Sequence, residues 1–163
     1  MSTQYVKTDT VLDKILAYKV EEIAAEKAGI IKSTVPVVSG VTQPGPAQVI
    51  RQAAKASQAT LFELDTAFRY SDVQTNESGS TFRYAAAAGQ LEWNEAAGPM
   101  AAPIQVGIQG THQVHNASLA ISAIRLLQNQ LPVTESQVAR ALADVSCIGR
   151  VEGFLANVTD PDP

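Results

Sequence analysis

Apolar residues recur at helical spacing near the start of the chain, and this pattern predicts a first helix over residues 10–28. Thr10 can cap its start, with Asp13 three residues later in a capping-box arrangement. Gly29 is a natural residue to end it. The apolar side of this helix carries Val11, Leu12, Ile15, Leu16, Ile23 and Ala24.

A short β-branched run over residues 35–39 predicts a buried strand. Gly45 and Pro46 then begin a second helix, which we expect to run to about Ser57 with its apolar residues facing inward. The order of strand and helix in this part of the chain is typical of α/β proteins.

The middle of the chain has a different pattern, in which short β-rich segments are divided by turn residues. Asn76 with Gly79 marks one turn, and Gly89 marks another. This spacing predicts an antiparallel meander or a pair of hairpins over the segments 60–64, 68–73, 81–85 and 91–93. A loop over residues 94–103 follows, and 104–108 is predicted to be another strand.

Two helices are predicted in the last third of the chain. The segment 112–129 is apolar on most sides, which indicates a helix buried by its neighbours. Thr134 caps the second helix, with Gln137 at the capping-box position. The apolar stripe of this second helix consists of Val138, Ala141, Leu142 and Val145.

The elements together predict one α/β domain over residues 1–163, with a mixed sheet, an antiparallel hairpin region and flanking helices. A further strand is expected to start within residues 149–154, and residues 155–163 are expected to form a frayed tail.

The composition excludes some classes of partner. The net charge is -4 and the basic residues are scattered, whereas nucleic acid and anionic membranes need a clustered basic face. No apolar run approaches the roughly 20 residues that span a bilayer, and the N-terminus lacks the apolar region of a secretory signal. The single cysteine, Cys147, allows no internal disulfide, so a cytoplasmic location is expected.

Common catalytic and phosphate-binding motifs are absent from the 163 residues: there is no GxxxxGK[ST], GxGxxG or HExxH. His112 and His115 lie three residues apart on a predicted helix and could share a metal. The alternative is that one lies at the helix start and the other is a polar core or surface residue. Cys147 is interpreted as a small buried hydrophobic residue.

Three segments have a recognisable form when taken in order: IAAEKAGIIKSTVPVVSG, GTHQVHNA and GRVE. They resemble the folylpolyglutamate synthases and bifunctional dihydrofolate synthases of the Mur ligase family, from about Glu21 to Phe154. The resemblance implies that residues 23–154 form part of a Mur-ligase central domain. It also implies an ATP-dependent ligase that adds glutamate to folates, with ATP and magnesium as cofactors.

The resemblance assigns roles to individual residues. Lys27 matches a lysine that becomes carbamylated beside a magnesium ion, where the carbamate supplies oxygen ligands suited to a hard cation. Asn116 matches the asparagine that contacts adenine, and an amide offers it both a donor and an acceptor. Arg150 matches an arginine that reaches the ATP phosphates. His112 begins the helix whose N-terminus faces the nucleotide.

Each of these residues also has a simpler interpretation. Lys27 lies near a helix C-terminus, where its charge complements the macrodipole. Asn116 could be an ordinary polar residue one turn into a helix. Arg150 could pair with Glu152 or with a surface carboxylate.

The sequence also departs from the family pattern. Leu12 stands where the family has a metal-binding histidine, CIGR replaces the usual WPGR, and the C-terminal domain that opens with DGAHNP is not included. We therefore expect this chain to be inactive alone. The alternative is a non-catalytic or complementing domain, such as a pseudoenzyme, fusion or designed chain, which would self-associate or bind a second chain.

The first helix is a separate case. Residues 1–22 are atypical for the ligase family, and the first 25 or so residues, which include TDTVLDKILAYKVEEIAAEKA, are similar to the opening helix of indole-3-glycerol phosphate synthases. No later barrel motif follows, and the length cannot hold eight strand–helix repeats. A barrel enzyme is therefore excluded.

Overall fold

The computed structural model describes residues 11–89, 91 and 102–146, and the side chains from residue 18 onward within that range. The first part of the chain is a βαβ unit preceded by a helix. Helix α1 (Val11–Ala28) leads into strand β1 (Val37–Ser39), helix α2 (Pro44–Ala56) and strand β2 (Leu61–Glu63). Strands β1 and β2 pair in parallel, and Val38 lies opposite Phe62.

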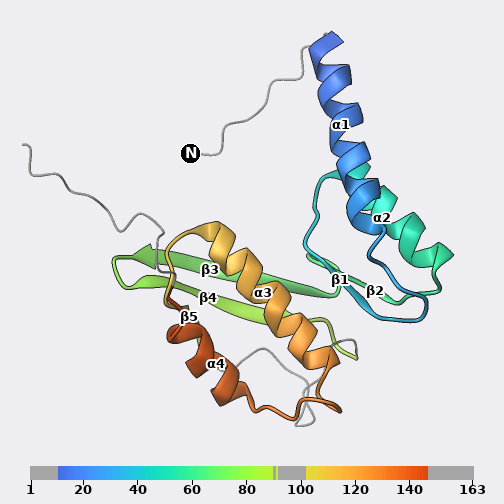
Figure 1. Cartoon of the computed structure of the whole chain (residues 1–163). Helices are drawn as coiled ribbons and strands as arrows, with labels where there is room; N and C mark the ends of the chain where they lie inside the picture. Colours follow the sequence, from blue (N-terminus) through green and yellow to red (C-terminus); the bar gives the residue numbers. More distant parts are fainter. Residues whose placement is uncertain (1–10, 90, 92–101, 147–163) are drawn as a thin grey trace, which may run out of the picture.

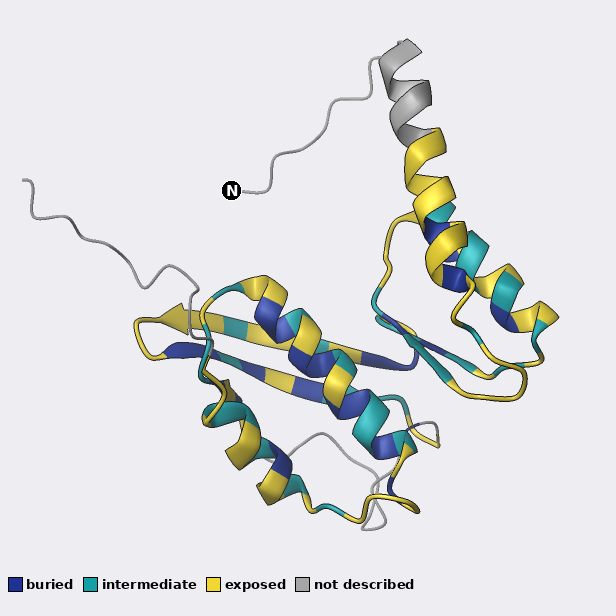
Figure 2. Ribbon diagram, viewed as in Figure 1, coloured by how far each residue is buried: buried dark blue, intermediate teal, exposed yellow. Residues whose placement is uncertain are grey.

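Helices α1 and α2 pack against each other through small residues. Ala24 and Ala28 are the buried positions of α1, and Ala47 and Ala54 are those of α2. The carboxylate of Glu21 lies near Gly45 in the first turn of α2, where a negative charge complements the helix dipole. The rest of the described surface of α1 is exposed (Figure 2).

The second part is a three-stranded antiparallel sheet covered by two helices. Strands β3 (Phe68–Asn76), β4 (Gly79–Ala86) and β5 (Ile104–Val106) pair in that order. Helix α3 (Thr111–Leu126) lies along this sheet, and α4 (Glu135–Ala143) lies beside β5 (Figure 1). Among the described residues, one isolated bridge, between Leu64 and Phe68, links the two sheets.

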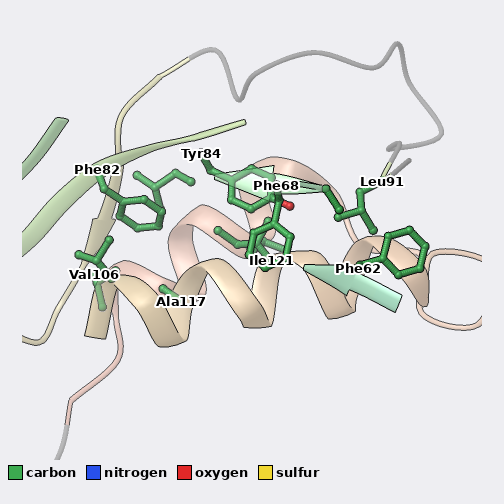
Figure 3. Packing of buried hydrophobic residues seen from close by; sticks show 12 residues of the cluster. Phe62, Phe68, Phe82, Tyr84, Leu91, Val106, Ala117 and Ile121 are labelled. Atoms are coloured by element: carbon green, nitrogen blue, oxygen red, sulfur yellow. The ribbon is translucent and has the colours of Figure 1, made fainter. Parts of the chain in front are cut away.

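The main core lies between α3 and the antiparallel sheet (Figure 3). Phe68 and Tyr84 stack with ring centroids 6.1 Å apart. Phe82, Val114 and Ile121 are fully buried beside them. This core fixes α3 to β3 and β4, and α3 in turn contacts β1, so α3 connects the two parts of the molecule.

The predicted α/β class is confirmed. Parallel and antiparallel pairing are both present, although they are divided between two sheets instead of one mixed sheet. The predicted helices correspond to α1, α2, α3 and α4. The predicted segments 68–73 and 81–85 pair antiparallel as β3 and β4, and the separate strand predicted at 104–108 is β5. The segment 60–64, predicted as part of the antiparallel region, is instead β2 and pairs in parallel with β1. Within the part of the chain that the structure describes, no helix has the length and hydropathy needed to cross a bilayer.

Some predicted boundaries were wrong. Leu91, predicted to begin a strand, is a buried residue outside any strand. The remainder of that segment, the strand predicted at 149–154, the frayed tail and Cys147 lie outside the described residues. So does Thr10, the predicted cap of α1.

Candidate functional site

The carboxyl end of β1 is the point where segments distant in the sequence meet. Ser39 is buried there, and its hydroxyl accepts a hydrogen bond from the Val41 amide at 3.3 Å. A Cβ atom on the next residue, Gly40, would collide with the imidazole Nε2 of His115 and would lie 2.7 Å from its Cε1. Leu119, one turn further along α3, would be 3.1 Å from the same atom. The absence of a side chain at Gly40 therefore allows α3 to approach β1 closely.

The His115 ring is held on a second side by Tyr70 of β3. The two rings meet edge to face, with centroids 6.2 Å apart and an interplanar angle of 83°. His115 is half-buried, and no hydrogen bond to its imidazole forms within residues 11–89, 91 and 102–146. The contact that places α3 on β1 is thus one of ring packing.

Lys27 also lies near this strand end. It is exposed in the last turn of α1. It borders a small hollow of about 190 Å³ that also reaches Ser39 and Gly40. Lys27 is the one charged residue that borders the hollow, and the other lining residues are Ala28, Ile30, Ile31, Val37, Val38, Val41 and Ile50.

The start of α3 has a glycine cap. Gly110 is the N-cap with φ 110°, a backbone conformation that favours glycine, and it offers no side chain to the helix. Its amide donates to the Ser80 hydroxyl at 3.0 Å. The His112 ring folds back over it, since a Cβ on Gly110 would lie 2.7 Å from His112 Cε1.

Asn116 lies one turn beyond His112, and both side chains are exposed. In the described residues, the Asn116 amide makes no hydrogen bond, so its donor and acceptor are open to a ligand. The prediction that these residues begin a helix is confirmed. Their proposed contacts with a nucleotide remain predictions, and Arg150 lies outside the described residues.

The described residues do not by themselves form a complete metal site. They contain no group of three or more histidine, cysteine or carboxylate side chains that could hold a metal ion. The hollow beside Lys27 is bordered by no aspartate or glutamate. The two histidine rings pack on different glycines, Gly40 and Gly110, which gives no support to a metal shared between them.

The sequence reasoning missed the contact between Gly40 and His115. The signals were present, since VPVVSG ends in a glycine and GTHQVHNA contains a second histidine. Only the folded arrangement brings the two together.

Comparison with known proteins gives a consistent result. The chain is 33% identical over 140 residues to a dihydrofolate synthase/folylpolyglutamate synthase of Bacillus subtilis, which covers 85% of this chain and 30% of that protein. It is 26% identical over 151 residues to a folylpolyglutamate synthase of Lacticaseibacillus casei, covering 90% of this chain and 33% of the relative. The chain therefore spans about a third of the length of these relatives. No family model matches it.

Solved structures support the fold. The apo form of the L. casei enzyme superimposes with a TM-score of 0.67 at 24% identity, over 88% of this chain and 33% of that one. A Mycobacterium tuberculosis folylpolyglutamate synthase complexed with ADP gives a TM-score of 0.62 at 22% identity, over 91% of this chain and 29% of that one. The coverage fits part of a central domain.

Proposed function

We propose, from a homology to folylpolyglutamate and dihydrofolate synthases that covers most of this chain, that it forms part of the ATP-binding domain of a ligase of that kind. The observation that carries the proposal is the meeting of two motif segments at the carboxyl end of β1. VPVVSG supplies Gly40, and GTHQVHNA supplies His115, which packs on it. Ligands of open α/β sheets bind at the carboxyl ends of parallel strands.

The nucleotide contacts that we propose lie on and near the first turns of α3. Asn116 presents an exposed amide that suits an adenine edge. His112 lies at the N-terminal end of the helix, where the backbone dipole favours an anion. Arg150 would add a permanent positive charge for the phosphates.

Lys27 is proposed as the site of carbamylation, because it borders the hollow at the end of β1. Carbamylation adds carbon dioxide to the neutral amine and releases a proton, which leaves an anionic group. A ¹³C carbamate signal in labelled bicarbonate that disappears in Lys27→Ala would support this role, and its absence from the unaltered chain would reject it. A carbamate at Lys27 would supply oxygen atoms of the kind that suit magnesium.

We propose that the substrates of the ligase are folate and glutamate, and that the protein is located in the cytoplasm. The 163 residues contain no GxxxxGK[ST] loop, so we expect them to bind nucleotide without catalysing ligation by themselves. Folate- and glutamate-dependent ATP hydrolysis by the pure chain would contradict that expectation.

A non-catalytic or complementing role is the second candidate, and one observation favours it. Large apolar side chains are exposed on and around α1 and β1, where a further segment or chain could cover them. These side chains are Tyr18, Val20, Ile23, Ile30, Val35 and Val41.

Calorimetric titration with ATP and magnesium tests the proposed function. The unaltered chain is expected to release or absorb heat in a saturable way, and Asn116→Ala and Arg150→Ala are expected to weaken binding. Equal binding heats in the unaltered chain, Asn116→Ala and Arg150→Ala would contradict a nucleotide site at Asn116 and Arg150. Gln52→Ala, an exposed change on α2, serves as a control that should bind like the unaltered chain.

A further inference from the structure

His115 occupies a position that the resemblance assigns to no function. Its ring fills the space above Gly40, touches the edge of Tyr70, and belongs to the residue directly before Asn116. We propose that His115 is a positioning residue of the nucleotide site: it holds the first two turns of α3, and with them the Asn116 amide, against the carboxyl end of β1. This inference rests on the proposed function.

The contact is suited to positioning because it joins elements of two different sheets. Strand β1 belongs to a two-stranded sheet, and among the described residues one isolated bridge links that sheet to the antiparallel one. Helix α3 is packed on both, and His115 touches Gly40 on one side and Tyr70 on the other. A flat ring between a bare backbone and a second ring leaves little freedom to slide, since packed interiors do not deform continuously.

The orientation of Asn116 follows from that of His115. Neighbouring residues of an α-helix are turned by about 100°, so a helix that rotates about its axis carries both side chains with it. His115 faces β1 and Tyr70, while Asn116 faces solvent. A hydrogen bond to a ligand tolerates only a few tenths of an ångström about its ideal length of about 2.9 Å. A shift of the His115 ring would therefore displace the Asn116 amide from its hydrogen-bonding position.

Gly40 provides a way to test the contact from the opposite side. Its φ lies outside the left-handed region, so alanine is compatible with its backbone, and the added methyl group acts mainly through the collision with His115, with a lesser close contact to Leu119 at 3.1 Å. Gly40→Ala and His115→Ala thus disturb the same contact by overfilling and by emptying it. Two changes that act through one contact are expected to be non-additive.

The experiment is a double-mutant cycle in which ADP affinity is measured by calorimetry on the full 163-residue chain. Gly40→Ala and His115→Ala are each expected to weaken ADP binding about tenfold, and the double variant is expected to be no weaker than the poorer single one. His115→Phe keeps a ring between Gly40 and Tyr70 and is expected to retain affinity within about threefold. Ile121→Val, in the core further along α3, should lower stability in urea without changing affinity.

The outcomes separate the two proposals. ADP binding that is lost in Asn116→Ala but unchanged in Gly40→Ala and His115→Ala would overturn the role of His115 and leave the proposed function standing. Additive losses in the double variant, or no recovery in His115→Phe, would overturn it as well. If the unaltered chain binds no ADP, the proposed function fails and the positioning role falls with it.

Discussion

Arg125 is buried in the core of the molecule, where an arginine needs partners for its charge. Only 4% of the residue is exposed. Its guanidinium lies 4.8 Å from the centre of the Tyr84 ring and donates a hydrogen bond to the Leu91 carbonyl at 2.9 Å. The Tyr84 hydroxyl in turn shares a hydrogen bond with Ser122 at 2.8 Å. Burial lowers the pKa of Arg125 and raises that of Tyr84.

Removing this arginine should be costly. Arg125→Ala leaves the buried Leu91 carbonyl without its donor and opens a cavity beside Tyr84. We expect the free energy of unfolding to fall by about 2–4 kcal/mol, measured by urea denaturation. Arg140→Ala is the matched control, because its side chain is exposed and its pair with Asp144 is long at 4.0 Å. That change should cost no more than about 0.5 kcal/mol, and an equal loss in both variants would contradict the assignment.

The raised pKa of Tyr84 gives the stability a pH dependence. Burial is its main cause, and it outweighs the hydrogen bond with Ser122 and the charge of Arg125, which both act to lower the pKa. The folded state therefore holds this proton more tightly than the unfolded chain, whose tyrosine pKa is about 10. The stabilisation is fully present below about pH 10 and is lost as the pH rises through the folded-state pKa.

Urea unfolding at about pH 9 and about pH 11 can detect this loss. Tyr84→Phe should reduce the difference in unfolding free energy between the two pH values, while costing about 1 kcal/mol at neutral pH through the lost hydrogen bond to Ser122. An identical pH dependence in Tyr84→Phe and in the unaltered chain would show that Tyr84 is not its source.

Single-residue roles could be anticipated from the sequence only where a motif carried them. Lys27, His112 and Asn116 were singled out in this way, and their roles remain predictions. The contact between His115 and Gly40 depends on how α3 crosses β1, which no local pattern encodes. Arg125 was missed for the same reason, since its burial is decided by the sheet beneath it.

At the scale of elements, the sequence predicted a helix end best where side chains of the same segment cap the free backbone amides. The predicted capping box of α4 is confirmed: the Thr134 hydroxyl accepts from the Gln137 amide, and the Gln137 side chain accepts from the Thr134 amide. Helix α3, by contrast, begins at a glycine without a side-chain cap and depends on packing instead. Cap signals therefore locate α4 more sharply than α3.

The cap of α4 can be tested directly. Thr134→Ala removes the acceptor for the Gln137 amide and should lower the free energy of unfolding by about 1 kcal/mol. Thr134→Ser keeps the hydroxyl and should retain most of that stability. Thermal and urea denaturation can both measure the difference. Equal stability of the alanine and serine variants would mean that the cap contributes nothing.

Strand boundaries were predicted less well, for identifiable reasons. Strand β1 begins at Val37 rather than at residue 35, because Pro36 has no amide to donate, and the first ladder bond runs from the Val37 amide to Thr60. Strand β3 continues to Asn76 through a register shift between Ser71 and Gln74. The shift contains Asp72 at φ 55°, a bulge that a simple alternation of polar and apolar residues does not reveal.

At the scale of the whole molecule, apolar surface is unevenly covered. The antiparallel sheet, α3 and α4 share a continuous core, whereas α1 packs mainly on α2, and Tyr18 and Ile23 on α1 and Ile30 just after it are exposed. Exposed apolar side chains favour association with another chain or copy. The net charge of -4 gives only weak electrostatic repulsion between two copies of the chain.

We therefore expect the isolated chain to self-associate as its concentration rises, measured by light scattering or sedimentation. Replacing Ile23 and Ile30 together by lysine should shift the equilibrium about tenfold or more toward monomer, because two apolar contacts are lost. Gln52→Lys adds a charge at an exposed polar position and should have little effect. A compact monomer at every concentration would count against uncovered apolar surface as an interaction site.

The most direct measurement of the proposed nucleotide site follows the imidazole NMR signals of the two histidines during an ADP titration. The chain contains only His112 and His115, so each signal can be assigned with one variant. Both signals are expected to move together and to saturate, and the movement should be lost in Asn116→Ala. Signals that stay fixed in the unaltered chain, or that move equally in Asn116→Ala, would contradict a nucleotide site at the start of α3.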